Sequence, residues 1–92
     1  MPYHEMEDEL SSFTKNQSRA INSLKEELEA IDWYQQRVDV VEDEELKKIL
    51  EHNRDEEKEH AAMLIEWLRR NDEVMSKELK DWLFTDKPFA HD

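Results

Sequence analysis

Three side chains of metal-binding type, Glu27, Glu57 and His60, occupy positions where a helix would ordinarily place an apolar residue. Burying an unpaired carboxylate costs on the order of several kcal/mol unless a positive group faces it. Few lysine or arginine residues share these positions, whereas a bound metal cation would compensate the carboxylates. Glutamate combined with the pattern Glu-x-x-His is a ligand set that binds iron or manganese inside helix bundles.

Two long helices are needed to position these side chains. Apolar residues in a heptad-like spacing predict one helix over residues 7–39 and another over residues 44–70. The seam of the first helix is Ala20, Leu24, Glu27, Ile31, Tyr34 and Val38. The seam of the second helix is Leu46, Leu50, Asn53, Glu57, His60, Leu64 and Trp67. The three polar residues therefore lie in phase with the apolar contacts of each helix.

A turn near residues 40–43 separates the two helices, although no glycine marks it. Asp43 is predicted to cap the second helix, because a carboxylate there can accept a hydrogen bond from the first helical turn. Residues 73–83 predict a short third helix with one apolar face, and residues 85–92 are expected to form a flexible tail. We expect one all-α domain over residues 1–92, an antiparallel two-helix hairpin plus a short third helix.

Glu27 and Glu57 lie at equal distances from this turn, since the midpoint between them is residue 42. In an antiparallel hairpin both carboxylates should lie roughly 20 Å from the turn, at about 1.5 Å of rise per residue. His60 is one helical turn beyond Glu57 on the same face. The three side chains are therefore predicted to converge from two helices.

Residues 51–60 contain no apolar side chain, and two interpretations of this stretch stay open. The first is a buried metal site opposite Glu27. The second is an exposed stretch held by ion pairs between neighbouring helical turns, such as Glu56 with His60. The phase of Glu57 and His60 and the presence of a partner glutamate favour the metal site.

The chain supplies only half of the ligands of a two-metal carboxylate site. Such sites in four-helix bundles use a glutamate from each of two helices and Glu-x-x-His from each of the other two. A two-fold axis would double the set to four glutamates and two histidines. A chain of 92 residues also buries little core by itself. We therefore predict a homodimer that forms a four-helix bundle with the metals at its interface.

Composition excludes several other classes of protein. The chain has no cysteine, which rules out disulfides and thiolate metal sites. The formal net charge of −12 argues against nucleic acid and anionic membranes as partners. No apolar run spans a bilayer, and the acidic first ten residues do not have the pattern of a secretory signal. We expect an intracellular protein.

The helices carry sequence blocks that resemble the encapsulated ferritins. The first helix contains EELEAIDWY at residues 26–34, and the second contains HNRDEEKEHAAM at 52–63 and EWLRRND at 66–72. The likeness continues through WLFT at residues 82–85. This resemblance implies a two-helix protomer that dimerises into a ferritin-like four-helix core, with five dimers in a decameric ring.

The resemblance also implies a function and a place in the cell. The ring would be a ferroxidase, oxidising Fe(II) with dioxygen inside an encapsulin nanocompartment in the cytoplasm, where the shell holds the mineral. Two irons per dimer would be bound by Glu27, Glu57 and His60 of both chains. The chain ends in KPFAHD, without the apolar C-terminal peptide that targets members of this family to the shell. Truncation or fusion to the shell would account for this departure.

Further site residues follow from the same resemblance. Tyr34 and Trp33 would flank the irons, with Tyr34 in a core, hydrogen-bonding or redox role. Glu26 and Glu29, which lie off the seam of the first helix, would draw metal toward the site together with Trp33. Two other functions stay open: a non-catalytic oligomer that binds zinc or manganese, and a purely structural helical adaptor.

Overall fold

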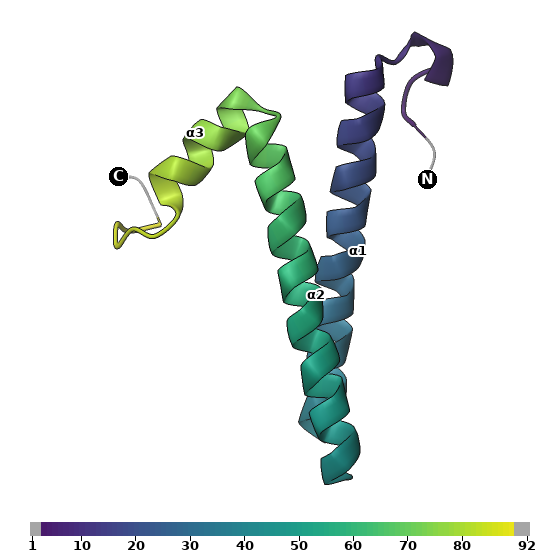
Figure 1. Ribbon diagram of the computed structural model, residues 1–92, viewed down its shortest axis with the longest axis vertical. Coiled ribbons are helices and arrows are strands. Elements are labelled where there is room, and N and C mark those ends of the chain that lie inside the picture. The colour runs from purple at the N-terminus through teal and green to yellow at the C-terminus, as the bar shows by residue number, and fades with distance from the viewer. Residues whose placement is uncertain (1–2, 90–92) are drawn as a thin grey trace.

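The computed structural model describes residues 3–89 of the chain. It contains a short 3₁₀ helix, η1 (Glu7–Glu9), followed by α1 (Ser12–Val40), α2 (Glu44–Arg70) and α3 (Glu73–Trp82) (Figure 1). No strand occurs among the described residues, so the prediction of an all-α hairpin with a short third helix is confirmed.

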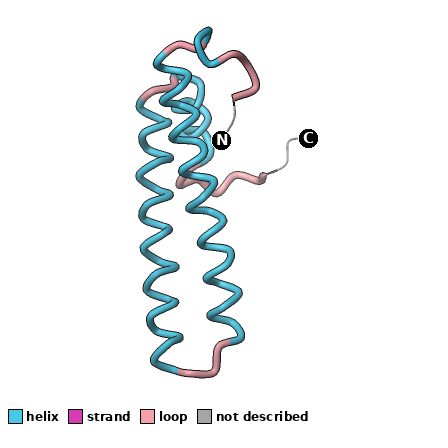
Figure 2. Tube along the Cα trace, turned by 90° about the vertical axis from the view of Figure 1, so that its right-hand side faces the viewer, coloured by secondary structure: helices cyan, strands magenta, loops and turns pink. Residues whose placement is uncertain are grey.

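Helices α1 and α2 run side by side in opposite directions and are joined by a short turn at one end of the molecule (Figure 2). The side chain of Asp43 caps α2 as predicted, accepting a hydrogen bond from the backbone N–H of Leu46 at 2.9 Å. At the other end of α2 the chain bends into α3, which points away from the hairpin (Figure 1). Asp72 caps α3 by accepting from the backbone N–H of Met75 at 2.9 Å.

The first helix begins later than the sequence pattern predicted. Residues 7–9 form the separate helix η1, and Leu10 is extended, with φ −85° and ψ 138°. The Ser11 side chain then accepts a hydrogen bond from the backbone N–H of Thr14 at 3.1 Å, which fixes the start of α1 at Ser12. Helix α3 ends at Trp82, one residue before the predicted end.

The part of the tail that the structure describes contacts α3. The rings of Phe89 and Trp82 stack with centroids 6.1 Å apart. The Lys87 Nζ lies 4.5 Å from the centroid of the same Trp82 ring. The last three residues of the predicted tail, 90–92, lie outside the described residues.

The hairpin has a thin core. Only four apolar side chains among the described residues are buried: Ala20, Val38, Ala61 and Leu68. The radius of gyration is 17.2 Å, whereas a compact chain of this length would have about 12 Å. The accessible surface of 7733 Å² exceeds by about 2,000 Å² the area expected for a compact protein of this mass. The single chain therefore leaves much of its helical surface uncovered.

Candidate metal centre

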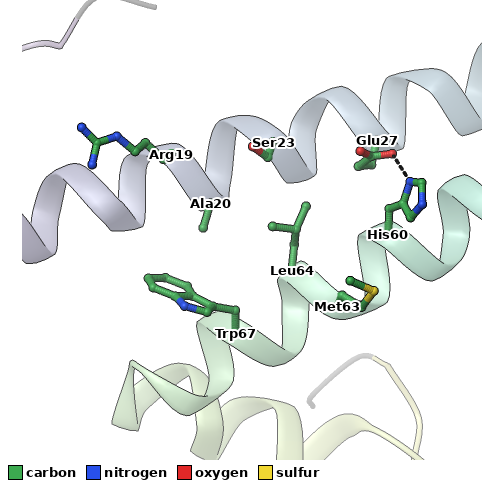
Figure 3. Close-up of a pocket in the computed structure, with 8 residues that line it drawn as sticks. All are labelled: Arg19, Ala20, Ser23, Glu27, His60, Met63, Leu64 and Trp67. Carbon is green, nitrogen blue, oxygen red and sulfur yellow. Dashed lines mark ion pairs between the residues drawn. The ribbon is translucent and has the colours of Figure 1, made fainter.

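Glu27 on α1 meets Glu57 and His60 on α2 at one point of the hairpin. One ligand atom from each of the three side chains lies within 4.8 Å of the other two. The His60 Nδ1 is 3.5 Å from the Glu27 Oε2 and 3.4 Å from the Glu57 Oε2. Figure 3 shows Glu27 and His60 facing one another from the two helices. The structure thus brings together the three residues that the sequence singled out.

These carboxylates are sheltered but poorly compensated. The side chains of Glu27 and Glu57 are 22% and 24% exposed, and that of His60 is 47% exposed. The Glu27 Oε2 is buried, and no described residue forms a hydrogen bond with it. The contact with His60 is close enough for an ion pair but does not have hydrogen-bond geometry. A buried acceptor left in this state is unfavourable, and a bound cation would remove the penalty.

The donor atoms define which cations fit. Two carboxylates and one imidazole form an oxygen and nitrogen set that suits iron, manganese or zinc ions. Three ligands from one chain leave coordination positions for further ligands or a small substrate. The arrangement can therefore hold a divalent ion that remains accessible to chemistry.

An open groove runs along the hairpin from this cluster (Figure 3). Its walls are Arg19, Ala20, Ser23 and Glu27 from α1, and His60, Met63, Leu64 and Trp67 from α2. Arg19 and Ser23 were not predicted to line a groove beside the cluster. Arg19, Ser23 and Glu27 follow one another at intervals of four residues, and this spacing was the available signal, because such residues share a helix face.

Residues 51–60 of α2 contribute both to the cluster with Glu27 and to ion pairs outside it. The Arg54 side chain is only 17% exposed and donates from Nη1 to the Gln35 Oε1 of α1 at 3.0 Å. Arg54 also pairs with Asp55 at 3.0 Å. This hydrogen bond lowers the pKa of Asp55 and adds to the ion-paired network along the helix.

Glu56 pairs with His52 at 2.8 Å, so its expected pairing with His60 is not observed. His60 faces Glu57 and Glu27 instead. The ion-paired face and the converging cluster thus use different histidines of the same helix.

The other predicted site residues lie outside this cluster. Tyr34 is half-buried, about two helical turns from Glu27, and the guanidinium of Arg37 lies 5.4 Å from its ring centroid. Glu26, Glu29 and Trp33 are exposed. Within the described residues, neither of these glutamates belongs to a group of three potential ligands. The roles of these four residues remain predictions.

A second carboxylate of α2, Glu66, lies at the junction with α3 in very different surroundings. Arg69 donates to both of its oxygens at 2.6 and 2.7 Å, and Arg70 donates at 2.7 Å. The hydrogen bonds from Arg69 and then Arg70 lower the pKa of Glu66 from its ordinary 4.5 to about 2. Arg69 Nη1 is also 3.4 Å from the Ser76 Oγ of α3. This cluster connects α2 to α3.

Comparison with known proteins places the chain in a family. The family model described as EncFtn-like matches residues 2–86. A ferritin-like protein of Thermotoga maritima is 59% identical over 96% of this chain and 77% of its own length. An encapsulated ferritin-like protein of Rhodospirillum rubrum is also 59% identical, over 95% of this chain and 62% of its own.

No helix within residues 3–89 is both long and apolar enough to cross a membrane.

A solved structure agrees closely with the whole fold. The crystal structure of protein ne0167 from Nitrosomonas europaea has a TM-score of 0.94 and 63% identity, covering 99% of this chain and 100% of that one. The encapsulin nanocompartment cargo protein EncC of Myxococcus xanthus is more distant, at 31% identity over 87% of this chain and 62% of its own. The resemblance to the encapsulated ferritins is thereby confirmed, and the chain belongs to the EncFtn-like family.

Proposed function

We propose that this chain is the subunit of a ferroxidase, which oxidises Fe(II) to Fe(III) with dioxygen at a site shared by two copies of the chain. The observation that carries the proposal is the buried Glu27 Oε2, which no described residue hydrogen-bonds although it lies against Glu57 and His60. A site of two carboxylates and one imidazole is suited to iron, and iron is here the substrate.

The chemical roles follow from the charges of the ligands. Carboxylates of Glu27 and Glu57 stabilise Fe(III) more than Fe(II), because the higher charge is attracted more strongly. The His60 imidazole supplies a neutral nitrogen donor and leaves coordination positions open. Two neighbouring irons give one electron each to a shared dioxygen molecule, so a pair of metals is required.

The need for two metals supports a shared site. One chain provides two glutamates and one histidine, and a two-fold axis doubles this to the ligand set of a two-iron carboxylate centre. The groove beside the cluster and the large uncovered surface of the hairpin offer a place for the second copy. We propose two irons per dimer, Tyr34 beside them, and Glu26, Glu29 and Trp33 as residues that guide iron in.

The names of the relatives suggest where this reaction takes place. The protein of Rhodospirillum rubrum is described as encapsulated and that of Myxococcus xanthus as an encapsulin nanocompartment cargo. We extend this to the present chain, as a decameric cargo of an encapsulin shell in the cytoplasm. The chain spans 62% of both relatives, so the extension applies to the portion that they share.

Iron oxidation in air, followed by absorbance, tests the proposed activity. The wild-type chain should accelerate the reaction over buffer, and His60→Ala should lose about tenfold or more of the rate. His52→Ala is the matched control, because His52 is on the same helix but pairs with Glu56 at 2.8 Å outside the cluster. Equal rates in the two variants would contradict the assignment.

Measurements of metal binding, assembly and thermal stability separate the competing functions. Metal binding without any acceleration over buffer would indicate a non-catalytic metal-binding oligomer. Assembly and thermal stability that do not respond to metal would indicate a structural adaptor. Native mass spectrometry tests the shared site: two irons per dimer are expected, and two irons bound to each chain of an obligate monomer would refute it.

A further inference from the structure

Met63 is an oxidisable side chain beside the candidate iron site. It follows His60 by three residues on α2 and lines the same groove as His60 and Glu27 (Figure 3). The residue is 61% exposed in the single chain. Among the methionines of residues 3–89, it alone lines this groove, because Met6 lies before η1 and Met75 lies on α3.

We propose that Met63 is a site of oxidative modification, converted to methionine sulfoxide by the peroxide that iron oxidation produces. This inference rests on the proposed ferroxidase function. Two Fe(II) ions give two electrons to dioxygen, which takes up two protons and leaves as hydrogen peroxide. The Met63 sulfur then accepts one oxygen atom from the peroxide, and the other oxygen leaves as water.

The chemistry of the groove favours Met63 over its neighbours. A thioether takes an oxygen atom from peroxide in one two-electron step, without a radical. The Trp67 indole, four residues further along the same wall, is oxidised mainly by one-electron oxidants. His60 is engaged with Glu27 and Glu57. Met63 is therefore the group that peroxide leaving the cluster along this groove meets and can oxidise directly.

A second copy of the chain would make Met63 more selective for peroxide that forms at the irons. A partner packed against the groove would shield Met63 from peroxide in the bulk solvent but not from peroxide formed at the irons. Met6 offers a matched control, since it is 66% exposed and lies away from the groove. The source of the oxidant therefore decides which methionine reacts first. Conversion of Met63 to a polar sulfoxide would also weaken apolar packing in the groove.

The test measures the sulfoxide at each methionine by peptide mass spectrometry of the full chain. One sample receives Fe(II) and air, with catalase present to remove peroxide from the bulk. A second, metal-free sample receives hydrogen peroxide. With iron and catalase, Met63 should be oxidised about fivefold or more above Met6, and with added peroxide Met6 should react at least as fast as Met63.

Two variants give the assignment its controls. Glu27→Ala should reduce Met63 oxidation to the level of Met6, because it removes a ligand of the proposed site. Met63→Leu, which preserves volume, should abolish the gain of one oxygen in that peptide. Fast iron oxidation with equal labelling of Met63 and Met6, or with Trp67 oxidised first, would overturn the inference and leave the ferroxidase standing. Iron oxidation no faster than in buffer would overturn both.

Discussion

Helix α2 carries carboxylates in two contrasting settings. Glu66, at the junction with α3, is 41% exposed and accepts hydrogen bonds from two guanidinium groups, none longer than 2.7 Å. Glu57, nine residues earlier, is 24% exposed and has a single imidazole at 3.4 Å. Its neighbour Glu27 has a buried oxygen that no described residue hydrogen-bonds. The more sheltered acids are thus the less well compensated.

This inversion separates a structural ion pair from a binding site. Burial raises the cost of an uncompensated charge, so a carboxylate that serves only stability should gain partners as it becomes buried. Glu66 has such partners although it is the more exposed acid, and they lower its pKa to about 2. Glu27 and Glu57 do not follow this expectation, and a cation from solution would restore the balance. Substitutions of Glu27 and Glu66 should therefore have different effects.

Removing a ligand should affect metal binding far more than removing the junction glutamate. Glu27→Ala should weaken the binding of a divalent ion by about a hundredfold or more, because the buried donor is lost. Glu66→Ala should leave the affinity within about threefold, since its partners are arginines. Isothermal titration with Mn(II) or Zn(II) measures both. Similar losses in the two variants would erase the distinction between the clusters.

Metal should stabilise the folded protein through the sheltered cluster alone. At a free-metal concentration of a hundred times Kd, linkage predicts about 2.7 kcal/mol of added stability. Thermal unfolding with and without Zn(II) should show this shift in the wild type and in Glu66→Gln, and not in Glu27→Gln. A shift that persists in Glu27→Gln would place the metal elsewhere.

Neutralising the two kinds of carboxylate should have opposite effects on the metal-free protein. Glu27→Gln should raise the stability by about 1 kcal/mol, because it removes a poorly compensated charge from the seam. Glu66→Gln should lower the melting temperature, because it weakens the hydrogen bonds from Arg69 and Arg70. Melting temperatures at neutral pH, measured with a chelator present, compare them. A change of the same sign in both would contradict the inversion.

Acid should remove the contribution of Glu66 over a defined range of pH. Its folded pKa lies below its ordinary value, at about 2 instead of 4.5. The stabilisation is therefore present above pH 4.5 and is lost as the pH falls toward 2. The melting-temperature difference between wild type and Glu66→Gln should shrink over that range. The effect is small because the cluster is exposed to water. A melting-temperature difference between the two proteins that grows on acidification would contradict the prediction.

Much of the fold was predictable because local signals agreed with the seam pattern. Asp43 and Asp72 cap helices at the starts that the sequence indicated, and the heptad-like phase brings Glu27 against Glu57 and His60. The late start of α1 was missed, since the acidic residues 7–9 are equally compatible with a first helical turn. The competing signal was Ser11, whose hydroxyl caps the helix.

Other features depend on contacts between elements that a one-dimensional pattern does not contain. Arg54 donates a hydrogen bond across the hairpin to Gln35. The sequence pattern had predicted only ion pairs between neighbouring turns of the same helix. Trp82 is contacted by Lys87 and Phe89, although the tail has no periodic pattern that would predict contact with a helix. In both cases the sequence shows a side chain able to make the contact, but its partner depends on which elements the fold brings together.

The hairpin turn has a consequence for how the sequence can vary. Val40 ends α1 and Glu44 begins α2, so only residues 41–43 connect the arms. Glu27 and Glu57 each lie 15 residues from position 42. One residue inserted into either arm would slide a helix by about 1.5 Å and rotate it by roughly 100°. Residues of the turn can therefore be substituted, but the number of residues between the turn and each glutamate must stay constant for the two carboxylates to meet.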